Sequence, residues 1–218
     1  MVATAEAYPQ PSHALALQTI AHELRQPLGA IESIAYYLNL VLPRDDHRAR
    51  EQAWRLQHLV AQSNWILTCG LQLVDETPFA PEPIDLEELI TQTAAARASH
   101  GDASIDLVLA GGLPVIQMDP GRGRRLLENL FTLFEHLSDE ARPILLSTSL
   151  IQLSTSLTQT GVCLTMTAAV PGYRSESYFG PGCCLSLASA RRTVEAHRGT
   201  FDLEVNPTSG IILKVVLP

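Results

Sequence analysis

The sequence predicts an α+β protein in which a helical hairpin precedes an α/β sandwich. Apolar residues recur at helical spacing between residues 12 and 76, and prolines then cluster in "TPFAPEP" at 77–83. Strand-like and helical patterns alternate beyond this point. We therefore expect a flexible N-terminus at 1–11, a helical hairpin at 12–76, a linker at 77–83 and the sandwich at 84–218.

The hairpin is predicted by two apolar seams of heptad type, separated at "LPRDD" by Pro43 and acidic residues. The seams consist of Leu17, Ile20, Leu24, Leu28, Ile31, Ala35, Leu38 and Leu42, and then of Ala53, Leu56, Val60, Ser63, Leu67, Leu71 and Val74. One hairpin cannot bury both seams well. A homodimer that forms a four-helix bundle is the simplest completion, and packing against the second half is the competing arrangement.

The second half predicts helices on one face of a sheet. Helical patterns occupy "IDLEELITQTAAARA", "GRGRRLLENLFTLFEHL" and "CLSLASARRTVEAHR". "SIDLVLA" alternates like a strand. Two hairpins are expected, one from "RPILLSTSLIQLSTSL" through the turn "TQTG" to "VCLTMTAAV", and one that turns at "NPTSG".

Composition narrows the possible partners and location. The 218 residues carry a formal net charge of −8, which disfavours binding to nucleic acid or an anionic membrane. No apolar run reaches the roughly 18–20 residues of a membrane span, and the N-terminus lacks the pattern of a signal peptide. The four cysteines match no zinc or redox motif, so we expect thiols in a reducing cytoplasm and no metal site.

The stretch "IAHELRQPLGAI", residues 20–31, contains the main candidate for chemistry. His22 lies two residues from the seam positions Ile20 and Leu24, so at about 100° per residue it faces away from the seam. A neutral imidazole there is a nucleophile near physiological pH. The zinc pattern H-E-x-x-H fails at Gln26. An incidental surface histidine remains an alternative, but Pro27 inside the helix favours a specialised local geometry.

"AHELRQPLGAI" resembles the phosphoacceptor H-box of sensor histidine kinases, and the resemblance extends over nearly the whole chain. It implies that residues 12–76 form the dimerisation and histidine phosphotransfer domain. It also implies that His22 carries the phosphoryl group and that Glu23 assists it. Gln26 stands where the family usually has Thr or Asn for phosphatase activity and could still hold a water.

Residues 84–218 resemble the family's catalytic ATP-binding domain, but with substitutions at the nucleotide site. Asp119-Pro120 and Asn129 match the N-box region. The resemblance places a magnesium-binding Asn where this chain has Leu133, followed by Phe134. An apolar side chain cannot hold a hard cation, which requires oxygen ligands.

The family's adenine-reading motif aligns with "AAVPG", where Ala168 replaces the Asp and only Gly172 remains. Its glycine-rich lid aligns with "GPGCCL", which keeps Gly180 and Gly182 but has Cys184 in place of the third glycine. We therefore expect that ATP and magnesium binding are lost and that autophosphorylation does not occur, because phosphoryl transfer from ATP depends on metal and positioning.

The resulting expectation is a two-component phosphorelay protein of the histidine phosphotransferase type. His22 would exchange a phosphoryl group with an aspartate of a response-regulator receiver domain, and an upstream hybrid kinase is a further candidate partner. Two alternatives stay open: a soluble ATP-dependent histidine kinase with a divergent nucleotide site, and a non-catalytic pseudokinase that binds partners. Helical phase places Arg25, Ser33 and Tyr36 roughly on the His22 side, so we expect them to contact the receiver.

Overall fold

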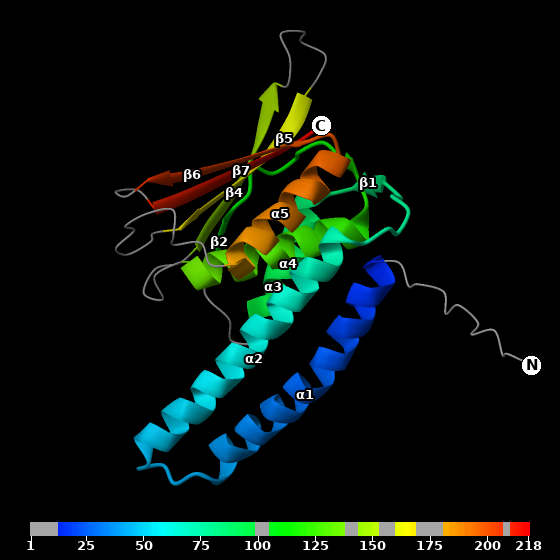
Figure 1. Ribbon diagram of the computed structural model, residues 1–218. Coiled ribbons are helices and arrows are strands. Elements are labelled where there is room, and N and C mark those ends of the chain that lie inside the picture. The colour runs from blue at the N-terminus through cyan, green and yellow to red at the C-terminus, as the bar shows by residue number, and fades with distance from the viewer. Residues whose placement is uncertain (1–12, 99–104, 138–143, 153–159, 169–180, 207–209) are drawn as a thin grey trace, which may run out of the picture. The chain divides into compact units, whose positions relative to one another are not determined.

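The computed structural model describes residues 13–98, 105–137, 144–152, 160–168, 181–206 and 210–218 (Figure 1). The N-terminal stretch 1–11 that the sequence analysis expects to be flexible lies outside these ranges. The chain divides into two compact units, residues 1–76 and 77–218. We describe each unit by itself.

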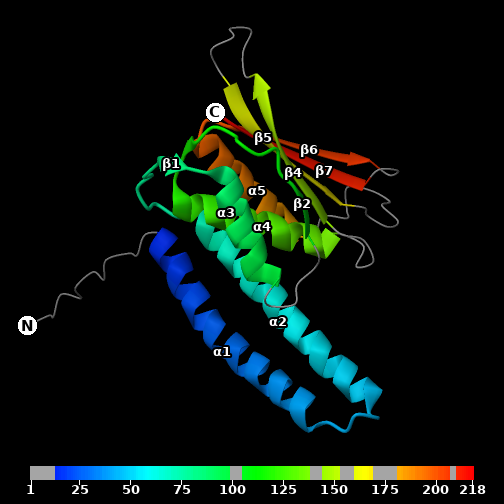
Figure 2. The ribbon, with the colours of Figure 1, turned by 180° about the vertical axis from the view of Figure 1, so that it is seen from behind.

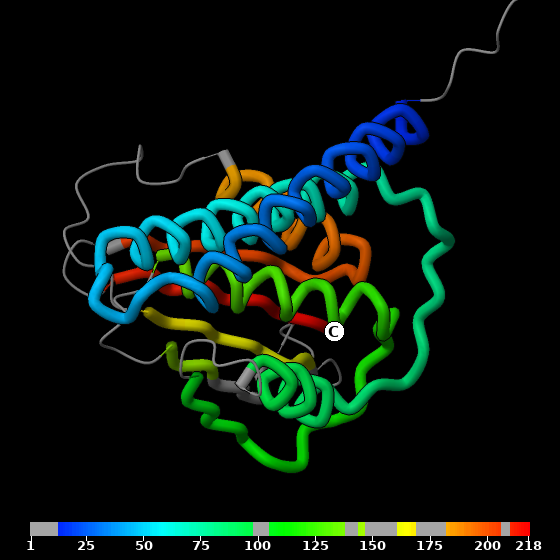
Figure 3. The backbone as a smooth tube through the Cα atoms, turned by 90° about the horizontal axis from the view of Figure 1, so that it is seen from below, coloured from blue at the N-terminus to red at the C-terminus, as the bar shows by residue number. Residues whose placement is uncertain are grey.

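The first unit is a hairpin of two long helices, α1 (His13–Val41) and α2 (His47–Leu73), which lie side by side (Figure 3). Asp46 caps α2, because its side chain accepts a hydrogen bond from the backbone N–H of Ala49 at 3.0 Å. Near the closed end, Asn39 donates to Gln57 at 2.8 Å and Arg50 donates to the carbonyl of Asn39 at 3.2 Å. These bonds fix the register of the two helices.

The hairpin buries few side chains and leaves an apolar groove. Among its described residues, the buried apolar positions are mostly small: Ala21, Ala35, Ala53, Val60, Trp65 and Cys69. Many of its large apolar side chains are exposed, including Leu24 and Ile31 of the first predicted seam. A groove of about 350 Å³ lies between the helices, lined by Leu24, Pro27, Leu28, Ile31, Ser63, Ile66 and Leu67.

The second unit contains two sheets and three helices. β1 (Glu82–Ile84) pairs antiparallel with β3 (Ile116–Met118). The larger sheet has the order β2-β4-β5-β7-β6. Its strands are β2 (Ile105–Val108), β4 (Ile144–Gln152), β5 (Thr160–Ala168), β6 (Thr200–Asn206) and β7 (Gly210–Leu217). β2 runs parallel to β4, and the other neighbours are antiparallel.

The three helices of this unit cover one face of the larger sheet (Figures 1 and 2). They are α3 (Leu86–Ala98), α4 (Pro120–Leu137) and α5 (Pro181–Ala196). Asp85 caps α3 by accepting from the backbone amides of Glu87 and Glu88 at 3.0 and 3.1 Å. The predicted α+β fold, a helical hairpin followed by a sheet with helices, is confirmed.

The core of the second unit is centred on α4, whose apolar face meets the inward side chains of β4, β5 and β7. Its fully buried large side chains include Leu130, Phe131, Leu133 and Phe134 from α4, with Leu146, Leu164, Met166 and Ile211 from the strands.

The sequence analysis places Glu82 and Pro83 in a linker, whereas both belong to β1. The pairing is short and its partner β3 is remote in sequence, so no local pattern indicates it. The expected turn "TQTG" is shorter than predicted on its C-terminal side, because Thr160 and Gly161 already pair within β5. The residues between β4 and β5 and those between β6 and β7 lie outside the described ranges. Within the described part of the chain, no helix has both the length and the apolar character needed to cross a membrane.

Candidate phosphoacceptor site

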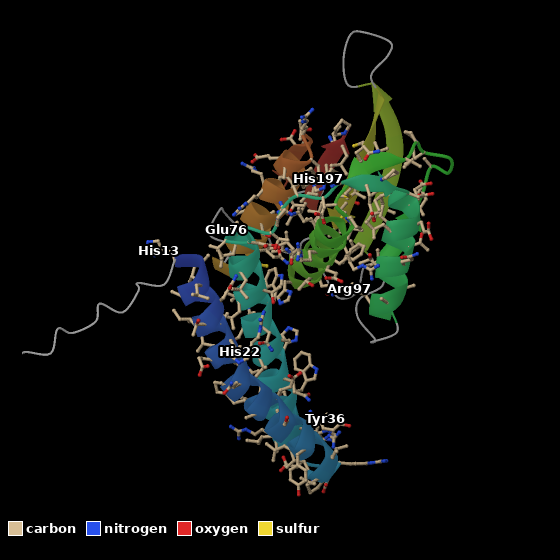
Figure 4. The ribbon with its side chains drawn as sticks, turned by 90° about the vertical axis from the view of Figure 1, so that its right-hand side faces the viewer. His13, His22, Tyr36, Glu76, Arg97 and His197 are labelled. Atoms are coloured by element: carbon tan, nitrogen blue, oxygen red, sulfur yellow. The ribbon has the colours of Figure 1, made fainter. Side chains whose placement is uncertain are left out.

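His22 lies on α1 with its side chain exposed (Figure 4). The amide Nε2 of Gln26, one helical turn later, is 3.5 Å from the imidazole Nε2. An amide NH₂ can only donate, so in this arrangement the ring nitrogen accepts and the ring proton resides on Nδ1. The long separation makes the contact weak. The site therefore presents an exposed imidazole with the side-chain amide of Gln26 beside its Nε2.

Pro27 does not interrupt α1, which continues from His13 to Val41. Proline has no N–H, so the carbonyl of Glu23 lacks the donor that it would otherwise receive from residue 27. The sequence analysis expects a kink or a specialised geometry at this position. In the structure the helix continues, and the carbonyl of Glu23, one residue after His22, lacks its usual helical hydrogen bond.

The three residues expected to contact a receiver domain have different surroundings. Arg25 donates to the hydroxyl of Thr68 on α2 at 3.1 Å, so its guanidinium group bridges the two helices. The hydroxyl of Ser33 donates to the carbonyl of Gly29 at 2.8 Å on the helix surface. Tyr36 is 59% exposed and lies toward the closed end of the hairpin (Figure 4). They do not form one cluster with His22.

Three of the described positions that align with a nucleotide site are buried in the second unit. Leu133 is fully buried on α4, and Ala168, at the end of β5, is 4% exposed. Gly182 is buried in the first turn of α5. Gly172 and Gly180 lie outside the described residues.

Asn129 connects two helices of that unit. Its side-chain amide donates to the hydroxyl of Ser189 at 3.5 Å, and the hydroxyl of Ser186 donates to its backbone carbonyl at 3.4 Å. All three residues are buried. Asn129 thus joins α4 to α5 in this chain, which is a structural role.

A polar cluster that the sequence analysis does not anticipate surrounds Asp119. Its carboxylate caps α4 by accepting from the backbone N–H of Arg122 at 3.0 Å and also accepts from the N–H of Ala80 at 3.2 Å. Burial raises the pKa of Asp119, but these two amides and the guanidinium groups of Arg122 and Arg125 outweigh it and lower the pKa below its usual value. The one available signal was "DPG", because Asp before Pro is typical of a helix start.

Across the residues that the structure describes, no group of three or more His, Cys, Asp or Glu side chains could hold a metal ion. His22 itself has an imidazole on the exposed surface of α1, and an imidazole can act as a nucleophile.

The chain is thus an α+β protein in which a helical hairpin with an exposed histidine precedes an ATPase-like sandwich. No protein-family model matches the chain. It is 29% identical over 213 residues to the sensor histidine kinase ZraS of Klebsiella oxytoca, covering 91% of this chain and 44% of the relative. It is 30% identical over 119 residues to ZraS of Escherichia coli K12, covering 51% of this chain and 24% of that protein.

Solved structures agree with the fold. Full-length ShkA in complex with AMPPNP matches with a TM-score of 0.61 and 23% identity, covering 93% of this chain and 45% of ShkA. The histidine kinase AdeS of Acinetobacter baumannii matches with a TM-score of 0.54 and 17% identity, covering 90% of this chain and 96% of AdeS. The homologues and structural neighbours are sensor histidine kinases, and the fold of this chain is similar to theirs, with a helical hairpin followed by an ATPase-like domain. It spans less than half the length of the curated relatives.

Proposed function

We propose that the protein is a cytoplasmic phosphorelay component in which His22 exchanges a phosphoryl group with the aspartate of a response-regulator receiver domain, without using ATP. The observation that carries this proposal is a contrast within the chain. His22 is exposed with an accessible Nε2, whereas the position aligned with the magnesium ligand is Leu133, fully buried in the core.

In the proposed transfer, the lone pair of His22 Nε2 attacks the phosphorus of an aspartyl phosphate. The P–O bond to the aspartate breaks, the carboxylate leaves with its electron pair, and an N–P bond forms. The proton on Nδ1 stays in place, so the ring becomes a phosphorylated imidazolium. The receiver supplies its own metal, and this chain needs only to present the imidazole. The reverse reaction passes the group onward.

Gln26 supports the same chemistry, because its amide lies beside Nε2. As a donor, it holds the proton on Nδ1 in the neutral ring. After transfer, the same NH₂ group is placed to donate to a phosphoryl oxygen. Glu23, next to His22 on the exposed surface of α1, is assigned an assisting role from the family resemblance alone.

Loss of nucleotide binding is part of the proposal. A magnesium ion requires oxygen ligands, and Leu133 offers none. Ala168 offers no carboxylate to read an adenine amino group. Both side chains are buried, so neighbouring residues occupy the space around them. We expect no magnesium-dependent binding at millimolar ATP, and clear micromolar binding by calorimetry would contradict this.

We further propose a homodimer in which the apolar groove of one hairpin packs against that of a second copy. Leu24 and Ile31 are 46% and 41% exposed at the groove. Burying such side chains is favourable by roughly 1.5–3 kcal/mol each when complete. We expect Leu24→Glu to convert the dimer into a monomer in sedimentation equilibrium, while Leu40→Glu, at an exposed position outside the groove lining, leaves it dimeric.

Receiver domains and an upstream hybrid kinase are the proposed partners. Arg25, Ser33 and Tyr36 remain the predicted contact residues on the hairpin. Alanine at Arg25 should slow transfer more than alanine at Arg191, an exposed position on α5. Equal transfer rates in these two variants would remove Arg25 from the docking surface.

The decisive experiment mixes the protein with a receiver domain whose aspartate carries labelled phosphate. We expect label to appear on this chain in the wild type and to be absent in His22→Gln. The matched control is His13→Gln, which changes an exposed histidine at the start of the same helix. Labelling of His22→Gln at the wild-type level would overturn the proposal, and unlabelled wild type with the receivers encoded near it would favour the pseudokinase alternative.

The second candidate function is an ATP-dependent histidine kinase with a divergent nucleotide site. The observation in its favour is that the relatives are sensor histidine kinases and match most of this chain. Incubation of the protein alone with γ-labelled ATP and magnesium decides between the two. We expect no label on His22, and autophosphorylation that disappears in His22→Gln would establish the kinase instead.

A further inference from the structure

The segment that follows the hairpin is held on the second unit at three successive points. The carbonyl of Thr77 accepts a hydrogen bond from the Arg122 guanidinium at 2.6 Å. The ring of Phe79 meets the ring of His197 edge-on, with centroids 4.8 Å apart. The amide of Ala80 donates to the carboxylate of Asp119 at 3.2 Å.

The residues that receive this segment are themselves fixed. Nε2 of His197 accepts from the backbone N–H of Asp119 at 3.0 Å, and its Nδ1 lies 2.7 Å from the carbonyl of Thr193. The ring therefore carries its proton on Nδ1 and joins the end of α5 to the start of α4. His197 is 5% exposed, so Phe79 packs against a buried and fully bonded imidazole.

Arg122 acts on the segment in two ways. Its guanidinium group bonds the carbonyl of Thr77 and also lies 5.7 Å from the centroid of the Phe79 ring, within the range of a cation–π contact. Its side chain is 17% exposed, so water screens these contacts only partly. Arg124, two residues later on α4, is exposed and borders a different groove, near Glu88.

We propose that Thr77–Ala80 is a releasable latch that sets the length of the tether between the two units. The hairpin helix α2 ends at Leu73, and Val74 caps it. With the latch closed, the tether consists of Val74, Asp75 and Glu76, which span at most about 10 Å. With it open, the chain is next anchored at Glu82 by the pairing of β1 with β3, and the tether reaches about 28 Å.

The latch is suited to release because its own segment is exposed. Phe79 is 41% exposed, and Thr77 to Ala80 belong to no helix or strand. The contacts described above are two hydrogen bonds, one ring contact and one cation–π contact, and opening such an exposed segment locally costs much less than unfolding the unit. Opening changes how far the ATPase-like unit can travel from His22. The inference does not depend on phosphotransfer at His22.

Limited proteolysis with chymotrypsin tests the latch, because Phe79 is both its central contact and a cleavage site. Arg122→Gln should accelerate cleavage after Phe79 by at least about fivefold, since it removes the bond to Thr77 and the cation over the ring. Arg124→Gln is the matched control and should cleave at the wild-type rate. Equal rates for all three proteins, or wild-type cleavage as fast as in the urea-unfolded chain, would overturn the latch.

Hydrogen exchange separates latch opening from loss of the fold. In Phe79→Ala, we expect the Ala80 amide to exchange at least about fivefold faster, while the amides of α4 and β7 keep their wild-type rates. Val115→Ala, at another exposed apolar position of this unit, should change neither. An Ala80 amide that keeps its wild-type exchange rate in Phe79→Ala would show that the ring does not hold the segment.

Discussion

The two units of this protein use apolar residues in opposite ways. The hairpin exposes large side chains such as Ile34, Leu40 and Trp54, and most of the apolar side chains that it buries are small. The second unit buries nearly every large apolar residue of α4, including Leu133, where the family resemblance expects a metal ligand. The hairpin thus leaves large apolar side chains on its surface, whereas the second unit packs them into its core.

Replacing a leucine by asparagine should have the largest difference in effect on the free energy of unfolding between the two units. Leu133→Asn removes a fully buried leucine and leaves an amide without designed partners, so we expect it to lower the free energy of unfolding by about 4 kcal/mol. Leu40→Asn, at a side chain 66% exposed, should cost less than about 1 kcal/mol. Urea unfolding measures both. A tolerated Leu133→Asn that gained ATP binding would show that a nucleotide site persists.

Asp119 offers a smaller effect that depends on pH. Asp119→Ala removes the cap of α4 and should lower the free energy of unfolding by about 1–2 kcal/mol at pH 7. The pKa of Asp119 is lowered in the folded protein, so its stabilisation is present above the unfolded pKa of about 3.9 and is lost as the pH falls through the folded pKa.

The difference between Asp119→Ala and wild type should therefore shrink below about pH 4 in urea titrations at several pH values. Asp119→Asn is the control, because asparagine is a good capping residue without a titratable charge. A difference from wild type that stays constant from pH 7 to pH 2 for Asp119→Asn would show that the carboxylate charge contributes nothing.

Arg198 should show the smallest effect, and in the stabilising direction. It has a positive φ of 59° two residues after the end of α5, a conformation that favours glycine. Arg198→Gly should raise the free energy of unfolding by about 1 kcal/mol. Glu195→Gly, inside the same helix, should lower it by about the same amount. Thermal unfolding compares the two, and a destabilised Arg198→Gly would mean that its side chain makes contacts that outweigh the backbone strain.

The elements that the sequence predicted well are those with a local apolar periodicity. The helices α1 and α2 and the apolar face of α4 follow from helical spacing, and helical phase placed His22 on the exposed side of α1. β1 and β3 were not anticipated, since three-residue strands joined across more than 30 residues carry no periodicity. The pairing of β1 with β3 depends on the tertiary structure of the second unit.

The cluster around Asp119 was missed for a related reason. Phe79, Asp119 and His197 are far apart in sequence, and each has an ordinary local explanation as a linker residue, a helix cap and a helix end. Only the folded unit brings the three together. Helical phase alone also could not predict that Arg25 bonds to Thr68, because this contact depends on where α2 lies beside α1.

The parallel pairing of β2 with β4 has a consequence for the order of folding during synthesis. The two strands are separated by β3 and α4, so the larger sheet closes only after a long loop has formed, and such non-local pairing is slow. The hairpin has only neighbouring helices to join, and it precedes the sheet in the chain, so it leaves the ribosome before the sheet does. We expect nascent hairpins to be helical, with the groove beside Leu24 open, before the sheet exists. If the proposed homodimer forms during synthesis, its assembly begins with the part of the chain that carries His22.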